Sequence, residues 1–396
     1  MMIALALLCV AGGSEMPQSY LLRMTKTLEA IRADLPAMRV LADQAAGRLA
    51  NGGKLWVTGP PSLVGEFCGR AGGLMMIRAL GDNTPGARDV VLAFADRNGS
   101  IPVLPILDGP LVISFSDRCF GISAGSGLTG STDRNPETSA PGAPCLRSHA
   151  TETGVSPTLA EAACGWVFTG ELIAALTRLG RMPVIYESIG AYGGQSRIMQ
   201  YKNGEIAWHE DHKVSKIEPG VLGGRYIDTI CAMLKRVEKE GRKDLRRAAS
   251  WAREARRRYM LSMGHIFPDE ISKTEIGKLF TSATWNAGFR TPRLEIACAK
   301  GDLIVHVGYQ HPPDDLLRLA RKCGARVVYV SLRSDRDFTR DKSVIWIDPM
   351  WDWPDACVPL EGYDIPILPA SGVINASIAW EIYRLARRGT PETVHG

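Results

Sequence analysis

The sequence predicts an α/β protein built from two doubly wound parallel-sheet domains in tandem. The first observation is a repeat in which three landmarks of the first half return downstream at intervals of 205, 213 and 210 residues: Gly59 with Gly264, Asp89 with Asp302, and Glu171 with Glu381. The second is that the matched apolar runs are continuous, which is typical of strands buried on both faces of a parallel sheet. The third is the length of 396 residues, which suits two or three domains.

Each half of the repeat predicts the same order of elements. A helical pattern begins at Tyr20 and, in the second half, at Tyr226; the first is interrupted at Pro36 because proline cannot continue a helix. The expected strands are 55–59, 89–94 and 111–116 in the first half, and 260–264, 302–307 and 327–331 in the second. An amphipathic helix closes each half, around Leu172 and around Ile378.

These elements set the expected domain boundaries. The first domain should cover 17–183, an extension 184–224, and the second domain 225–396. The first 15 residues are open to two interpretations: a signal peptide, which would imply export, or translated sequence before a true start at Met16. The odd number of cysteines, nine, argues against a complete disulfide framework and favours the cytoplasm.

The distribution of charge indicates which classes of binding partner to expect. The net charge of +5 is small for this length, and the one basic run, 235–258, is better explained as the solvated side of a helix than as a nucleic-acid surface, although it could attract anions weakly. The apolar N-terminal stretch is too short for a membrane-spanning helix, and no other segment is long enough. We therefore expect no integral membrane segment, and the charge pattern predicts no nucleic-acid partner.

Three stretches resemble the SIS (sugar isomerase) domain family. Residues 52–62, after a long helix, are similar to its first strand and glycine-rich turn; residues 300–328 resemble its second strand, helix and third strand; residues 365–374 resemble its closing segment. Two SIS domains in tandem form the isomerase half of glucosamine-phosphate synthase, so the chain resembles that layout. The resemblance implies two flavodoxin-like domains and a cofactor-free sugar-phosphate isomerase, if the protein is an enzyme at all.

The predicted ligand site lies where strands of the first domain end. In the SIS family a serine- and threonine-rich turn after the second strand holds phosphate, but the turns here, 95–100 and 308–313, contain no such cradle. The first domain is the better candidate because hydroxyls, a flexible backbone, charge and amides follow its strands. The predicted substrate-binding residues are Thr58, Gly59, Ser62, Arg97, Asn98 and Ser100 in the first domain, with His265 and His311 at equivalent places in the second.

The predicted acid–base residues lie in the extension. Glu187 follows an apolar strand and precedes a glycine-rich turn, so it is a candidate base; a surface carboxylate is the alternative. His212 closes a His-Glu-Asp-His run and is the candidate ring opener. A helix there could let His209 and His212 share a metal, but the surroundings favour a turn, and we expect no metal.

The sequence therefore predicts binding of a sugar phosphate or related carbohydrate derivative, with aldose–ketose isomerisation as the enzymatic alternative. A non-catalytic carbohydrate sensor or structural SIS homologue is the rival hypothesis. A homodimer fits either. The sequence does not identify the sugar, and it leaves open whether the two domains share one site.

Overall fold

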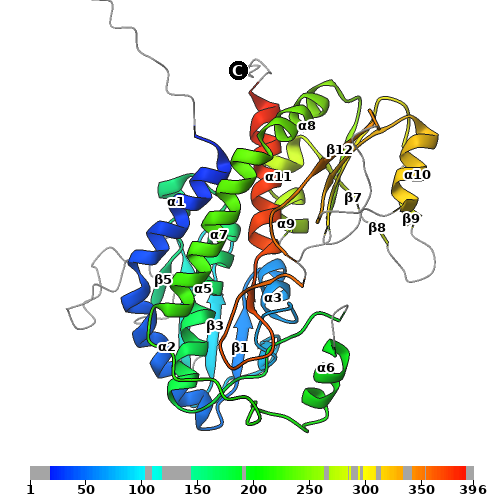
Figure 1. The fold of residues 1–396 in the computed structure, drawn as a ribbon. Coiled ribbons are helices and arrows are strands. Elements are labelled where there is room, and N and C mark those ends of the chain that lie inside the picture. The colour runs from blue at the N-terminus through cyan, green and yellow to red at the C-terminus, as the bar shows by residue number, and fades with distance from the viewer. Residues whose placement is uncertain are drawn as a thin grey trace, which may run out of the picture.

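Figure 1 shows the computed structural model of the chain, which describes residues 18–102, 109–117, 144–189, 193–262, 267–283, 285–286, 293–294, 298–308, 314–332, 341–352 and 354–388. Its strands form two separate five-stranded sheets. The first contains β1 (Leu55–Thr58), β2 (Ile77–Ala79), β3 (Val90–Phe94), β4 (Leu111–Ser116) and β5 (Cys145–Arg147). The second contains β6 (Arg258–Ser262), β7 (Thr281–Ala283), β10 (Leu303–Val307), β11 (Arg326–Val330) and β12 (Val344–Ile347).

Both sheets have the same topology. The order is β2-β1-β3-β4-β5 in the first and β12-β11-β10-β6-β7 in the second, and every neighbouring pair is parallel. Numbered within its own unit, each sheet reads 2-1-3-4-5, the flavodoxin-like order. The predicted fold class is therefore confirmed, and β3 and β10, which begin after Asp89 and Asp302, occupy the same third place. Periodicity did not reveal the short edge strands β2, β5, β7 and β12.

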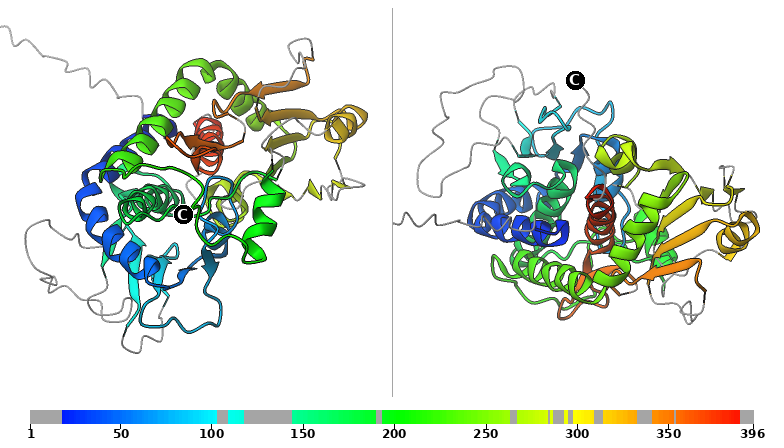
Figure 2. Two further views of the ribbon diagram at one scale, coloured as in Figure 1. Left: turned by 60° about the horizontal axis from the view of Figure 1, so that its bottom comes forward. Right: turned by 90° about the horizontal axis from the view of Figure 1, so that it is seen from above.

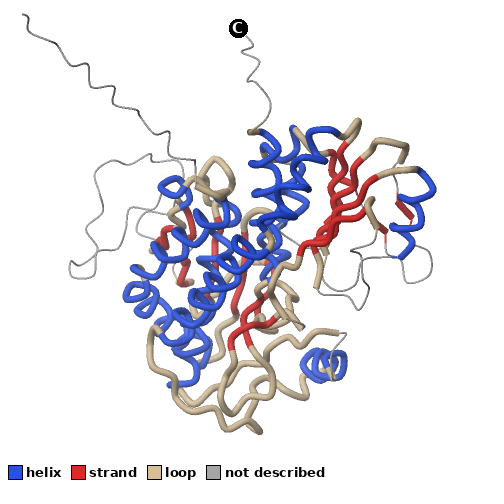
Figure 3. The backbone as a smooth tube through the Cα atoms, turned by 45° about the horizontal axis from the view of Figure 1, so that its top comes forward, coloured by secondary structure: helices blue, strands red, loops and turns tan. Residues whose placement is uncertain are grey.

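Helices flank the sheets and fill the space between them (Figure 3). The first unit has α1 (Tyr20–Ala33), α2 (Leu35–Ala50), α3 (Pro61–Phe67), α4 (Ala150–Thr153) and α5 (Pro157–Arg178). The second has α7 (Val221–Glu240), α8 (Arg242–Glu254), α9 (Phe267–Ser272), a 3₁₀ turn at Glu275–Lys278, α10 (Asp314–Cys323) and α11 (Ser371–Arg387). Along the chain, α6 (Gly194–Lys202) follows the first unit and precedes the second. Two short antiparallel pairs are β8 (Trp285–Asn286) with β9 (Arg293–Leu294) and β13 (Ala356–Val358) with β14 (Ile367–Pro369).

The first leading helix begins at Tyr20 as predicted, but its break and the start of the second leading helix differ from the expectation. The first breaks at Asp34, two residues before Pro36, because proline is tolerated in the first turn of the new helix α2. The second leading helix begins at Val221, inside the predicted extension, and breaks at Gly241.

The two units exchange helices. The first leading helices α1 and α7 pack on each other, while α1 also packs on α11 of the second unit and α7 on α5 of the first. The second leading helices pack within their own units, α2 on α5 and α8 on α11. Figure 2 shows α11 enclosed between the two units. This arrangement gives the pair an approximate two-fold symmetry.

The matched glutamates explain the exchange. Glu171 of α5 accepts hydrogen bonds from the backbone N–H groups of Gly220 (2.7 Å) and Gly223 (3.0 Å), at the start of α7. Glu381 of α11 accepts one from the N–H of Tyr20 (2.7 Å), at the start of α1. Each closing helix therefore caps the leading helix of the other unit, where the free N–H groups and the helix dipole favour a carboxylate.

The long apolar helix α5 is the core of the first unit. Among the described helices it alone is long and apolar enough to cross a membrane by length and composition, and its apolar stretch is wholly buried inside the protein, as in the core helix of many folded domains. Of the described cysteines, six are free and Cys145 is disulfide-bonded.

Candidate functional site

The strand order of the first unit reverses between β1 and β3, the place where flavodoxin-like sheets bind ligands. Thr58 ends β1 and is half-buried. Gly59 follows with φ +132°, and a Cβ there would lie 2.6 Å from the carbonyl oxygen of Phe94. Only glycine fits so close to the neighbouring strand, so the turn brings backbone, not side chain, to this edge.

Other predicted ligands of the first unit face the second unit. Ser62 is buried in the first turn of the short helix α3. Arg97 donates from Nη2 to the carbonyl oxygen of Asp269 in α9, across the boundary between the units. The strand ends of the first sheet therefore meet α9, and Arg97 already has a partner there.

In the turn after β3, the side chain of Asp96 occupies the backbone N–H groups. Asp96 Oδ1 accepts hydrogen bonds from the backbone N–H groups of Asn98 and Ser100, both at 2.9 Å. An anion bound by this turn would use the same donors. The predicted roles of Asn98 and Ser100 remain predictions, and their amides are engaged by Asp96.

The second-unit candidates His265 and His311 lie outside the described residues. Their predicted roles also remain predictions.

The predicted base is positioned by the extension. The backbone N–H of Tyr186 donates to the carbonyl of Gly73, and the N–H of Gly72 donates to the carbonyl of Tyr186, both at 2.8 Å, so the extension forms a short antiparallel pairing with the first unit. Glu187 comes next and is 8% exposed. Burial raises the pKa of its carboxyl above the usual value, Arg197 lowers it in part with its guanidinium Nε 3.9 Å from Oε2, and Asp364 raises it again.

His212, the predicted ring opener, lies in a turn, and the sequence favours a turn over a helix for this segment. His209 and His212 both direct Nδ1 at Asp211 Oδ1, at 3.1 Å and 3.0 Å. His212 Nε2 lies 3.2 Å from Oδ1 of Asp364. Burial is the main cause that lowers the pKa of His209, while the contacts from the two imidazoles, His212 first, lower the pKa of Asp211 to about 2.

One network joins these residues. Arg197 of α6 pairs with Asp364, which in turn contacts His212, and Arg197 also faces Glu187. Tyr363 Oη accepts hydrogen bonds from the N–H of Ile185 (3.2 Å) and from Arg197 Nη1 (3.4 Å). We call Glu187, Arg197, His209, His212, Tyr363 and Asp364 the junction cluster.

The junction cluster belongs to both parts of the chain. Glu187, Arg197 and the histidines come from the extension, whereas Tyr363 and Asp364 come from the loop between β13 and β14 of the second unit. The structure therefore places the two predicted catalytic residues, Glu187 and His212, in one network, linked through Arg197 and Asp364. No hydrogen bond or ion pair among the described residues joins this cluster to Ser62, Arg97 or their turn.

The cluster can move protons. A carboxylate whose pKa is raised is a stronger base than an ordinary one, and imidazole can donate or accept a proton. A neighbouring guanidinium can stabilise negative charge on a substrate oxygen. His209, Asp211 and His212 each offer one possible ligand atom, and these three atoms lie within 4.8 Å of one another. The three residues could therefore also hold a divalent cation.

Sequence reasoning missed Arg197, Tyr363 and Asp364. Arg197 lies on a polar helix. Tyr363 lies in a turn 166 residues further along the chain, next to Asp364, and no motif surrounds either residue. Only the fold brings them to Glu187.

The comparisons with known proteins concern the fold. No protein-family model matches the chain, and no curated protein sequence matches it. Among solved structures, the C-terminal domain of glucosamine-fructose-6-phosphate aminotransferase from Francisella tularensis is similar at 10% identity, with 93% of this chain and 96% of that chain covered and a TM-score of 0.42. Tagatose-6-phosphate ketose/aldose isomerase from Escherichia coli is similar at 12% identity, with 94% and 93% covered and a TM-score of 0.41.

Such low scores leave the strand order of this chain as the basis for its class. By that order it is a tandem protein of two flavodoxin-like parallel-sheet units, the layout expected from the SIS resemblance. Its distinctive feature is the junction cluster between them.

Proposed function

We propose that the protein binds a carbohydrate derivative, a sugar phosphate in the first instance, at the junction cluster and interconverts its aldose and ketose forms. The observation that carries the proposal is the network in which Arg197 and Asp364 link the buried Glu187 to His212. A base with a raised pKa and an imidazole are the two groups that this reaction needs.

The reaction would proceed by proton transfer alone. His212 passes a proton between the ring oxygen and the anomeric hydroxyl, which opens the sugar ring. The Glu187 carboxylate then takes the proton from C2 of the open aldose, leaving an enediolate whose negative oxygen faces Arg197. The proton returns to C1, and the hydroxyl proton of C2 moves to the oxygen on C1, which gives the ketose. No oxidant or reductant is consumed.

Deuterium exchange tests this proposal. Sugar phosphates incubated with the protein in deuterated water should gain deuterium at the carbon next to the carbonyl, because the abstracted proton exchanges with solvent before it returns. Glu187→Gln should lower the exchange rate by at least about a hundredfold, the usual contribution of a positioned base, while preserving thermal stabilisation by the sugar. Glu205→Gln is the matched control, since Glu205 lies in the same extension, is exposed and, among the described residues, accepts a side-chain hydrogen bond from Asn203 alone.

A non-catalytic carbohydrate sensor is the second candidate. It is favoured by the turn after β3, where Asp96 engages the two backbone amides that would otherwise be available to a phosphate. A sensor should be stabilised by a sugar phosphate without any deuterium incorporation. Exchange that persists unchanged in Glu187→Gln would reject the catalytic assignment of Glu187.

A further inference from the structure

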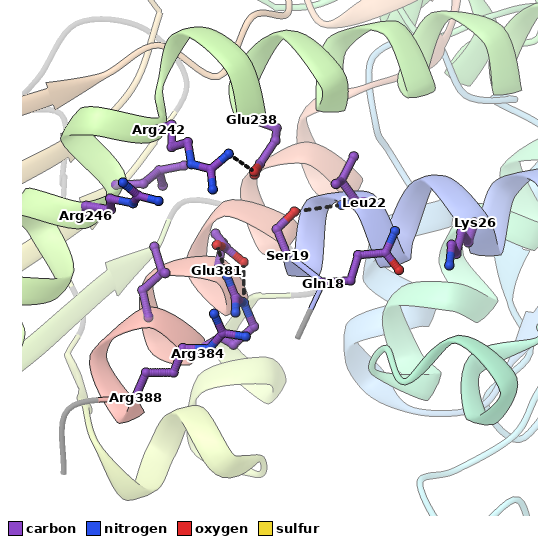
Figure 4. Close-up of a pocket in the computed structure, with 12 residues that line it drawn as sticks. Gln18, Ser19, Leu22, Lys26, Glu238, Arg242, Arg246, Glu381, Arg384 and Arg388 are labelled. Atoms are coloured by element: carbon purple, nitrogen blue, oxygen red, sulfur yellow. Dashed lines mark hydrogen bonds and ion pairs between the residues drawn. The ribbon is translucent and has the colours of Figure 1, made fainter. Parts of the chain in front are cut away.

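A second charged site lies at the opposite end of the molecule from α6, where α1 begins and α11 ends (Figure 1). The start of α1, the end of α7, the start of α8 and the end of α11 surround a pocket of about 530 Å³. Figure 4 shows arginines of α8 on one side of this pocket and arginines of α11 on the other. We call it the helix-end pocket.

The helix-end pocket is strongly cationic. Five basic side chains line it: Lys26, Arg242, Arg246, Arg384 and Arg388. Only two carboxylates, Glu238 and Glu381, line it as well, so positive groups exceed negative groups by three (five minus two).

Both carboxylates already have partners. Glu238 lies 3.5 Å from Arg242, and Glu381 accepts from the N–H of Tyr20 and from Arg384 Nε, both at 2.7 Å. Lys26 and Arg246 make no ion pair in the part of the chain that the structure describes. Burial and the neighbouring charge of Arg384 lower the pKa of Arg388, as expected where cations crowd together.

The first unit provides an internal control. Arg178 follows Glu171 at the same spacing as Arg388 follows Glu381 (178 − 171 = 388 − 381 = 7). Arg178 pairs with Asp43 of α2 at 2.5 Å and donates to the carbonyl of Ile217 at 2.8 Å. The corresponding positions of α8, counted from the helix break, are the uncharged Ala249 and Ser250. The carboxylate that Arg178 contacts on α2 therefore has no counterpart at these two positions of α8.

We infer that the helix-end pocket binds a small phosphorylated molecule with two or more negative charges. Guanidinium groups match phosphate oxygens in paired hydrogen bonds, and an ammonium group adds a mobile point charge. A pocket of this size suits a compact ligand better than a long polyanion. Because α1 belongs to the first unit and α8 and α11 to the second, the ligand would also tie the two units together.

Calorimetric titration tests the site. At fixed ionic strength, the full chain should bind inorganic pyrophosphate with a saturable one-site isotherm, and inorganic phosphate more weakly. Replacing Lys26 and Arg246 together with Ala should weaken pyrophosphate binding by about tenfold or more, because two charge-assisted contacts are lost. The matched control replaces Arg236 and Lys243, which carry the same charge on α7 and α8 but do not line the pocket.

The outcomes separate this site from the junction cluster. Glu187→Gln should bind pyrophosphate like the unsubstituted protein, whether or not the isomerase proposal holds. Equal weakening in both double variants, or a single-stranded oligonucleotide that binds better than pyrophosphate, would mean general surface charge and overturn the inference. The absence of saturable binding to the unsubstituted protein at millimolar pyrophosphate would overturn it as well.

Discussion

At the scale of single residues, His306 is the clearest source of acid sensitivity. It lies in β10, is 3% exposed, and neither ring nitrogen has a hydrogen-bond partner among the described residues. Burial lowers its pKa to about 4. The unfolded chain, with an ordinary histidine pKa of about 6.5, therefore binds the proton more readily, and stability should be lost as the pH falls from 6.5 to 4, by up to roughly 3 kcal/mol.

Replacing His306 tests this. His306→Leu should be at least as stable as the unsubstituted protein at pH 7, because a buried polar group without a partner is removed, and should lose less stability between pH 6.5 and pH 4. His306→Gln is polar but does not titrate. Its free energy of unfolding should also fall less between pH 6.5 and pH 4, but it should not be more stable than the unsubstituted protein at pH 7. Urea unfolding at a series of pH values measures both. Parallel pH profiles for the three proteins would contradict the assignment.

The raised pKa of Glu187 predicts how the rate of deuterium exchange depends on pH. Its pKa is raised, chiefly by burial, so the carboxylate needed for proton abstraction forms at a higher pH than that of an ordinary glutamate. If the isomerase proposal holds, the exchange rate should rise with pH through a midpoint higher than about 4.3, the ordinary glutamate value. A pH–rate profile of deuterium incorporation measures the midpoint. A flat profile from pH 4 to pH 8 would remove Glu187 from the rate-determining proton transfer.

At the scale of elements, the exchanged helix caps should be the points where the two units depend on each other. Glu171→Ala leaves the N–H groups of Gly220 and Gly223 without their acceptor, and Glu381→Ala does the same to Tyr20. Each change should lower the free energy of unfolding by about 1–3 kcal/mol, measured by urea unfolding. Gln, which still offers an acceptor oxygen, should cost less at either position.

The exposed Glu240→Ala, at the end of α7, is the control and should change stability by less than about 0.5 kcal/mol. If Glu171→Ala behaved like this control, the cap at α7 would contribute nothing to stability.

At the scale of the whole molecule, buried polar contacts join the units on both sides of the pseudo-two-fold axis. Glu66 of α3 accepts from Trp166 of α5 and lies beside Arg70, which pairs with Asp355 at 3.0 Å and reaches Ser371 at the start of α11. On the other side, Glu270 of α9 accepts from Trp380 of α11 at 2.5 Å and from Ser156 at the start of α5 at 2.7 Å. The two units should therefore unfold as one.

Asp355→Asn tests this coupling. Asp355 has φ +89°, a conformation that asparagine tolerates. If the amide oxygen keeps accepting from the N–H groups of Ala370 and Ser371, the change removes the charge and the acceptor opposite Arg70. Removing one partner of a buried ion pair costs about 3–5 kcal/mol, and the single unfolding transition should broaden or split. Asp352→Asn, exposed in the same segment, should leave the transition unchanged. A sharp, unshifted calorimetric peak for Asp355→Asn would mean that the ion pair does not couple the units.

The sequence by itself determined the repeat and most of the sheet. Asp89 and Asp302 show why: each accepts a hydrogen bond from the N–H three residues before it, at 2.9 Å in both units, so the signal is contained in a short stretch of chain. Continuous apolar strands and amphipathic helices are local patterns of the same kind. The short edge strands escaped detection because three or four residues carry too little periodicity.

Only the tertiary structure decided which unit each matched glutamate caps, which residues complete the junction cluster, and where the basic run of α8 points. Glu171 and Glu381 read as equivalent in the sequence, yet each bonds across to the other unit. Tyr363 and Asp364 reach Glu187 from the far end of the chain, and Arg242 and Arg246, expected to be ordinary solvated side chains, line a pocket with arginines of α11. The physical reason is that contacts between distant residues depend on how whole helices pack, and that packing leaves no pattern within a local stretch of sequence.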